Sequence, residues 1–200
     1  RWSSSEQEFP GGYLMSARTL HNPRTGETIT FTRTSRDTGG GLFEMNYKMA
    51  PHAAIADEHS HPHQEMIISV LSGTLTCTVD GADKKIQAGA KVIIPAGVFH
   101  FQRNDSETEV QAVEQYRPAL QMQEFFEVLI GWANDNKTNE WGLPTPLRSA
   151  VMHRYFKRSI RSSSKWRNLM AWLLAPLGRA LGYQREVEHY VRLAAQGDRQ

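Results

Sequence analysis

The 200-residue chain has little of several features that define particular protein classes. It contains one cysteine, Cys77, so an intrachain disulfide, a multi-cysteine zinc site and an iron–sulfur cluster are excluded. No run of 18 apolar residues occurs, so the sequence predicts no clear membrane span. These two absences favour a cytoplasmic protein, while the start at Arg1, without a methionine, is consistent with a truncated N-terminus. With 40% hydrophobic residues, 15 glycines and 9 prolines, the composition is that of a globular protein.

Acidic residues are missing from one long stretch, residues 142–184, and this absence divides the chain. Residues 1–117 carry 11 basic and 14 acidic side chains, which gives a net charge of −3. Residues 118–200 carry 12 basic and 7 acidic side chains, which gives +5. We therefore expect two parts of different chemistry, divided near residue 117.

The pattern of apolar residues changes at the same place. Short strands separated by turn residues are predicted over 27–34, 42–49, 66–71, 74–79, 91–94 and 109–116. After Pro118, apolar residues recur at three- and four-residue spacing, which predicts helices over about 122–133, 147–158, 166–174 and 185–193. The fold class expected is mainly β, with a β domain at 1–117 and a helical C-terminal extension at 118–200.

Two short segments contain the residues that can hold a metal ion. His59 and His61 lie two positions apart, so on a strand both imidazoles point to the same face. Neutral imidazole is the commonest protein ligand for transition metals. A third histidine, His100, follows a tight turn at Pro95–Gly97. A lone pair of histidines is a weak signal, and the third strengthens it.

Together these segments resemble the two signature motifs of the cupin superfamily. The first has the form H-x-H, three or four residues, E, six residues, G. The second has the form G, five residues, P-x-G, two residues, H, three residues, N. Every position of the second motif is matched, by Gly89, Pro95, Gly97, His100 and Asn104. The resemblance implies a double-stranded β-helix, that is, a jelly-roll cupin barrel. It also implies one divalent metal (Fe, Mn, Ni or Zn) per chain, held by His59, His61 and His100.

The sequence departs from the first motif at the glutamate. Counting back from Gly73, the expected carboxylate position is occupied by Met66, and Glu65 precedes it. Three alternatives remain open. Met66 replaces the carboxylate and leaves a three-histidine site; Glu65 reaches the metal through a bulge; or the site holds no metal and the histidines serve acid–base or binding work.

Further residues are predicted around this site. Met66, Ile68, Val70 and Phe99 are expected to line an apolar pocket. Glu114 and Tyr116 share a strand face and are weak candidates for a catalytic acid and a hydrogen-bond donor. His63 is expected in an exposed loop, and Cys77 as a buried, unreactive thiol.

The function expected is that of a small-molecule enzyme with a three-histidine metal centre. It would act on an apolar or aromatic substrate by oxygenase- or isomerase-type chemistry. One alternative is a non-catalytic ligand-binding or sensor cupin, and another is a metal-free cyclase or isomerase.

The partners expected follow from the C-terminal part. Its predicted first helix, 122–133, presents a large apolar face that must be buried on its own barrel, a second subunit or a membrane. Of these, a homodimer with the helices packed against a barrel is predicted. Basic residues between 148 and 179 alternate with tryptophans and leucines, and association of these helices with an anionic membrane surface is a further hypothesis. No nucleic-acid-binding motif is present, so no nucleic acid is expected.

Overall fold

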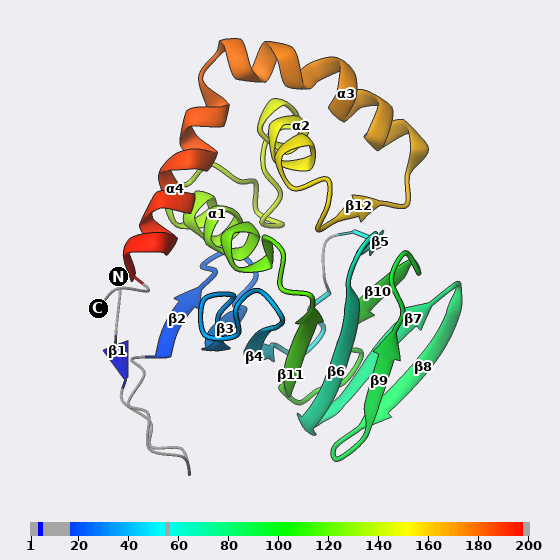
Figure 1. Cartoon of the computed structure of the whole chain (residues 1–200). Helices are drawn as coiled ribbons and strands as arrows, with labels where there is room; N and C mark the ends of the chain where they lie inside the picture. Colours follow the sequence, from blue (N-terminus) through cyan, green and yellow to red (C-terminus); the bar gives the residue numbers. More distant parts are fainter. Residues whose placement is uncertain (1–3, 6–16, 55–56, 198–200) are drawn as a thin grey trace.

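Two antiparallel sheets form the first part of the protein, as the computed structural model shows for residues 4–5, 17–54 and 57–197. The seven-stranded sheet contains, in spatial order, β1 (Ser4–Ser5), β2 (Ala17–His21), β3 (Thr28–Arg33), β4 (Phe43–Met49), β11 (Val110–Arg117), β6 (Glu65–Ser72) and β9 (Lys91–Ile94). The five-stranded sheet contains β12 (Arg161–Ser162), β5 (His59–Ser60), β10 (His100–Arg103), β7 (Thr74–Val79) and β8 (Ala82–Gln87). The predicted mainly β, jelly-roll class is confirmed (Figure 1).

Strand alternation places the core between the sheets. In β6, the residues Met66, Ile68 and Val70 are buried, while the residues between them are half-buried on the other face. β8 and β10 lie outside the ranges predicted as strands. β8 is a polar edge strand in which Ile86 alone is buried, and β10 buries the polar side chains of His100 and Gln102. Neither strand carries the apolar alternation that sequence reasoning detects.

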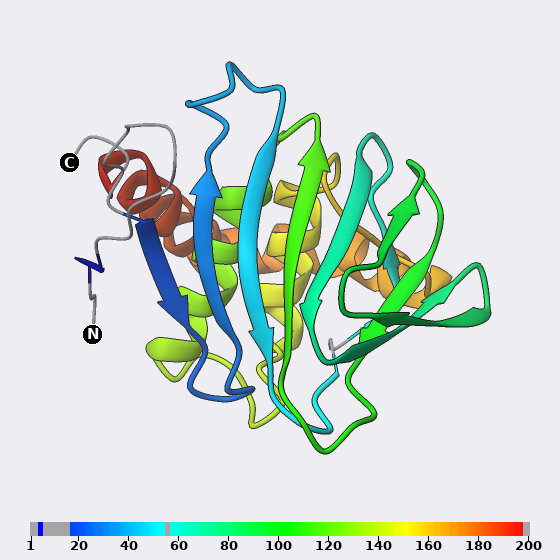
Figure 2. The ribbon, with the colours of Figure 1, turned by 90° about the horizontal axis from the view of Figure 1, so that it is seen from below.

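Four helices follow the barrel: α1 (Met122–Asn134), α2 (Pro146–Tyr155), α3 (Lys165–Ala180) and α4 (Tyr183–Gly197). They gather on one face of the seven-stranded sheet, which Figure 2 shows from the opposite side. The predicted helical extension is thus confirmed. The prediction ended the third helix at Leu174, whereas α3 continues through Pro176 to Ala180. None of these helices is long and apolar enough to span a bilayer.

Helix α1 packs within the chain on both sides of its apolar surface. Phe125 and Phe126 contact the barrel core, and Val128 and Trp132 are buried in a second cluster shared with α2 and α4. The exposed apolar surface on which the homodimer prediction depended is therefore covered by this chain itself. A homodimer stays a prediction.

The helical part also returns a strand to the barrel. β12 lies between α2 and α3 in the chain and pairs with β5, with Ser162 opposite His59 and Arg161 opposite Ser60. Two further hydrogen bonds support the pairing, from the Ser163 amide to the Glu58 carbonyl (3.0 Å) and from the Ser162 hydroxyl to Asp57 (2.9 Å). The β domain and the helical extension therefore share one sheet, directly beside the histidines.

Gly178 tests the packing of α3 on α2. A Cβ at this position would lie 2.6 Å from a Val151 methyl and 2.9 Å from the Leu147 carbonyl oxygen. Gly178→Ala should therefore lower the free energy of unfolding by about 1–3 kcal/mol, measured by urea denaturation. In an unobstructed helix the same change would raise it by about 0.5–1 kcal/mol, and a rise would contradict the packing described.

Candidate metal centre

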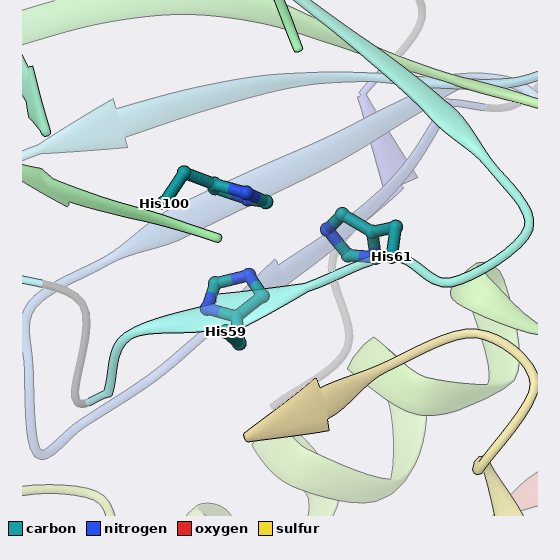
Figure 3. A group of neighbouring side chains, drawn as sticks. All are labelled: His59, His61 and His100. Atoms are coloured by element: carbon teal, nitrogen blue, oxygen red, sulfur yellow. The ribbon is translucent and has the colours of Figure 1, made fainter. Parts of the chain in front are cut away.

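Three histidines converge at two neighbouring interior strands of the five-stranded sheet, β5 and β10. His59 lies in β5, His61 follows directly after it, and His100 begins β10, where it pairs opposite His59. The ring centroids lie 4.5–5.2 Å apart, and one nitrogen of each ring lies within 4.8 Å of the other two. Figure 3 shows the three rings turned toward one another. The shared face predicted for His59 and His61 is thus present, and His100 joins it from the neighbouring strand.

The hydrogen bonds of the rings leave the converging nitrogens available. Each ring contacts a backbone carbonyl through Nδ1: His59 that of Asp57 (2.9 Å), His61 that of Ser159 (2.7 Å) and His100 that of Val98 (3.1 Å). A carbonyl oxygen only accepts, so each Nδ1 carries the proton and each Nε2 has a lone pair. The Nε2 atoms of His61 and His100 are buried without a hydrogen-bond partner. A divalent metal satisfies such atoms, so the three residues fit one.

The electrostatics of the site keep the histidines neutral. Burial lowers the pKa of His59 and lowers the pKa of His100 to about 3. Burial lowers the pKa of His61 well below its usual value, and the neighbouring His59 and His100 lower it further. Metal ligation requires neutral imidazole, so these shifts prepare the donor set for a cation.

The hydrogen bond that orients His61 comes from the helical part. Ser159 lies between α2 and β12, and its carbonyl oxygen accepts from His61 across a separation of 98 residues. Sequence reasoning missed this contact, because any residue type supplies a backbone carbonyl and no side-chain signal marks it.

Glu65 and Met66 lie on opposite faces of β6. Met66 is 1% exposed and points into the core, whereas Glu65 is half-buried on the other side. Among the described residues, the three histidines form the group of potential ligands and Glu65 is not part of it. The geometry thus matches the alternative in which Met66 takes the carboxylate position, and ligation by Glu65 stays a prediction.

A cavity of about 600 Å³ adjoins the histidines and lies between the barrel and the helices. His59 and His61 line it, together with the polar side chains of Gln102, Glu114 and Tyr116. Most of the remaining wall is apolar and comes from both parts of the chain, including Met45, Met49, Phe125, Phe126, Leu129, Met152, Ile160, Met170 and Leu174. Its size is that of a pocket for a small organic molecule.

The apolar residues predicted to line the pocket do not line this cavity. Met66, Ile68 and Val70 do point inward, but they pack in the closed core of the barrel. Phe99 is half-buried and also lies outside the lining. Their role in a pocket therefore stays a prediction, since the cavity found beside the histidines lies under the helices and not along β6.

Glu114 and Tyr116 do line the cavity, and the two side chains are joined. The Tyr116 hydroxyl donates to Glu114 at 2.6 Å, and the Tyr116 ring lies 5.0 Å from the His61 ring. Burial raises the pKa of Glu114 to about 7, although hydrogen bonds from Tyr116 and Gln102 favour its carboxylate form. Glu27, which sequence reasoning missed, also lines the cavity, and burial followed by the charge of Glu114 raises its pKa to about 7.

Two other predictions concern residues near the site. His63 is exposed, as expected for a loop residue after Pro62. Cys77 is buried in the core, and burial raises the pKa of its thiol to about 12, which fits an unreactive side chain.

Part of the chain matches a described protein family. Residues 45–116 match the Cupin domain family. None of the curated proteins compared with the chain matches it. Solved structures similar to this chain include KdgF from Halomonas sp., with 15% identity, a TM-score of 0.44, and coverage of 50% of this chain and 84% of that one. A predicted oxalate decarboxylase from Thermotoga maritima shows 18% identity and a TM-score of 0.44, with coverage of 51% of this chain and 91% of that one. The Cupin_2 domain of an XRE family transcriptional regulator from Enterobacter cloacae shows 20% identity and a TM-score of 0.41, with coverage of 46% of this chain and 95% of that one.

The position of Met66 generates a prediction about ligation. Met66→Glu places a carboxylate on the inward face, so it should tighten the binding of Mn²⁺ or Zn²⁺ by about tenfold or more in a calorimetric titration. It should also destabilise the metal-free protein by about 2 kcal/mol or more, because a polar group is buried. The control Glu65→Gln should leave the affinity unchanged. A large loss with Glu65→Gln and no gain with Met66→Glu would identify Glu65 as the ligand.

The raised pKa of Glu114 generates a prediction about stability and pH. The pKa of Glu114 in the folded protein, about 7, exceeds its ordinary value of 4.5. The contribution of Glu114 to the free energy of unfolding is therefore fully present below pH 4.5 and is lost as the pH rises through 7. Glu114→Gln has no carboxyl group, so it does not lose stability in this way. In metal-free protein, the stability of the variant relative to the original should therefore increase by about 2 kcal/mol between pH 5 and pH 8, measured by denaturant unfolding. The exposed Glu140→Gln should show no such trend, and a flat difference for Glu114→Gln would refute the shift.

Proposed function

We propose that this chain, which belongs to the cupin superfamily through its domain at residues 45–116, is a metal-dependent enzyme that acts on a small apolar or aromatic compound. His59, His61 and His100 would hold one divalent metal ion. One observation carries the proposal. The three rings converge while each Nδ1 contacts a backbone carbonyl, so three neutral Nε2 atoms face one point beside a cavity.

A bound ion would supply Lewis-acid chemistry, and iron would add redox chemistry. Three protein ligands leave coordination positions for a substrate, which is the arrangement of a catalytic site and not of a closed structural one. Burial favours the neutral, ligating form of the three histidines, because it lowers the pKa of each below its ordinary value.

The cavity wall supports an apolar or aromatic substrate. Phe125 and Phe126 of α1 and Met152 of α2 face the same space as His59 and His61. A polar substrate would leave hydrogen-bonding groups unpaired against such a wall. Binding of an apolar molecule would remove water from the space and strengthen the interactions of the histidines with charge.

Glu114 and Tyr116 supply the means to move a proton in this space. With its pKa raised to about 7, the Glu114 carboxyl is divided between its two protonation states near neutral pH and can take or give a proton. Tyr116 donates to it and fixes its orientation. These two residues support isomerase-type chemistry in which a proton is removed at one atom and returned at another.

The same pair favours a second candidate function. A carboxyl group with a pKa of about 7 in an apolar cavity can support a cyclase or isomerase that needs no metal. The two functions differ in their response to chelators and to the loss of one histidine.

Metal content tests the proposal directly. Protein loaded with Fe²⁺, Mn²⁺, Ni²⁺ or Zn²⁺ should hold about one equivalent by elemental analysis, and His61→Ala should hold less than about a tenth of that. His63→Ala is the matched control, because this histidine belongs to the same segment but is exposed, and it should keep full metal content. If no divalent ion loads, or if His63→Ala loses the metal as His61→Ala does, the three-histidine centre is wrong.

A further inference from the structure

Helix α3 lies on the outer side of the helical layer, above α2 (Figure 1). Its inner side is formed by small residues, Ala171, Ala175 and Gly178, which are buried against α2. Its outer side and C-terminal end carry large apolar side chains that are each 46–66% exposed: Trp166, Leu169, Trp172, Leu173, Leu177 and Leu181. A surface helix ordinarily turns polar residues to water, so this helix is apolar where it should be polar.

The segment that contains α3 is positively charged. Five exposed basic residues occur between the end of α2 and the end of α3: Lys157, Arg158, Arg161, Lys165 and Arg179. A sixth, Arg167, forms an ion pair with Asp57 and ties the start of α3 to the segment before β5. No acidic residue occurs in the sequence from 142 to 184. The exposed tryptophans and leucines of α3 therefore belong to a segment that carries exposed positive charge and no acidic residue.

We propose that α3 docks on the surface of an anionic lipid bilayer, lying in the plane of the interface. Tryptophan and leucine side chains enter the boundary between headgroups and acyl chains, while lysine and arginine contact anionic headgroups. A second copy of this chain fits the surface less well, because both copies would bring the same positively charged segment to the contact.

If α3 lies on the bilayer, the cavity that α3 lines is adjacent to the bilayer. Trp166 is 66% exposed and also lines the cavity, as do the half-buried Met170 and Leu174 of the same helix. The helix thus separates an apolar cavity from an apolar phase. This step rests on the proposed function, and it identifies the substrate class as an apolar compound that partitions into membranes.

Sedimentation of the full chain with lipid vesicles tests the docking. The protein should pellet with vesicles of phosphatidylcholine mixed with phosphatidylglycerol, bind phosphatidylcholine vesicles about tenfold or more weakly, and be released at high salt. The double variant Trp172→Ser/Leu173→Ser should bind the mixed vesicles about tenfold or more weakly, because both side chains are exposed and would enter the bilayer. Neither side chain lines the cavity, so the substitutions leave the cavity wall unchanged. Lys157→Gln/Arg158→Gln should weaken binding and its salt dependence.

The matched control is Leu71→Ser/Ile93→Ser, which removes two exposed apolar side chains from β6 and β9. It should bind the mixed vesicles as the original chain does. The proposal fails if the chain ignores anionic vesicles, or if the control loses binding equally. It also fails if light scattering shows a dimer that Trp172→Ser/Leu173→Ser dissociates, which would assign α3 to a second copy. All arms are run with a chelator, so the result does not depend on the proposed metal.

Discussion

The hydrogen bond between the His61 ring and the Ser159 carbonyl joins the barrel and the helical part of the molecule at the three histidines. It exists because β12 pairs with β5 and brings a segment from beyond residue 118 beside the first histidines. The same pairing holds α2 and α3 over the open side of the barrel, where they form the roof of the cavity. Without this attachment, His61 would lose the partner that fixes its tautomer, and the cavity would lose its apolar wall.

Burial acts in opposite directions on the two kinds of titratable group in this cavity. It favours neutral histidine, which is the ligating form, and it favours the protonated form of Glu114 and Glu27. A cation at the histidines would reverse the second effect, because its charge stabilises nearby carboxylates. The site therefore combines a donor set suited to a cation with acids whose protonation responds to that cation.

The sequence allowed the barrel and the three histidines to be predicted, because both depend on local pattern. Strand alternation located the core, and the spacing of His59 and His61 placed two rings on one face. Local pattern did not locate the cavity, since its wall combines β4, β11 and three helices whose mutual position no spacing encodes. It also missed β12, because a two-residue strand without apolar alternation carries no signal. It missed the role of Glu27 as well, because the pattern shows this residue only as the start of the strand predicted over 27–34.

Helix α3 has its apolar residues arranged in the reverse of the usual order for a surface helix. Its small buried residues allow close packing on α2, which leaves its large apolar residues on the outside. A helix selected for stability in water alone would have the reverse arrangement, because burying each large side chain contributes about 1.5–3 kcal/mol. A sequence that forgoes this stabilisation at several positions of one surface points to a role for that surface. Helix α3 also lines the cavity, so one helix contributes both to the exposed apolar surface and to the wall of the space beside the histidines.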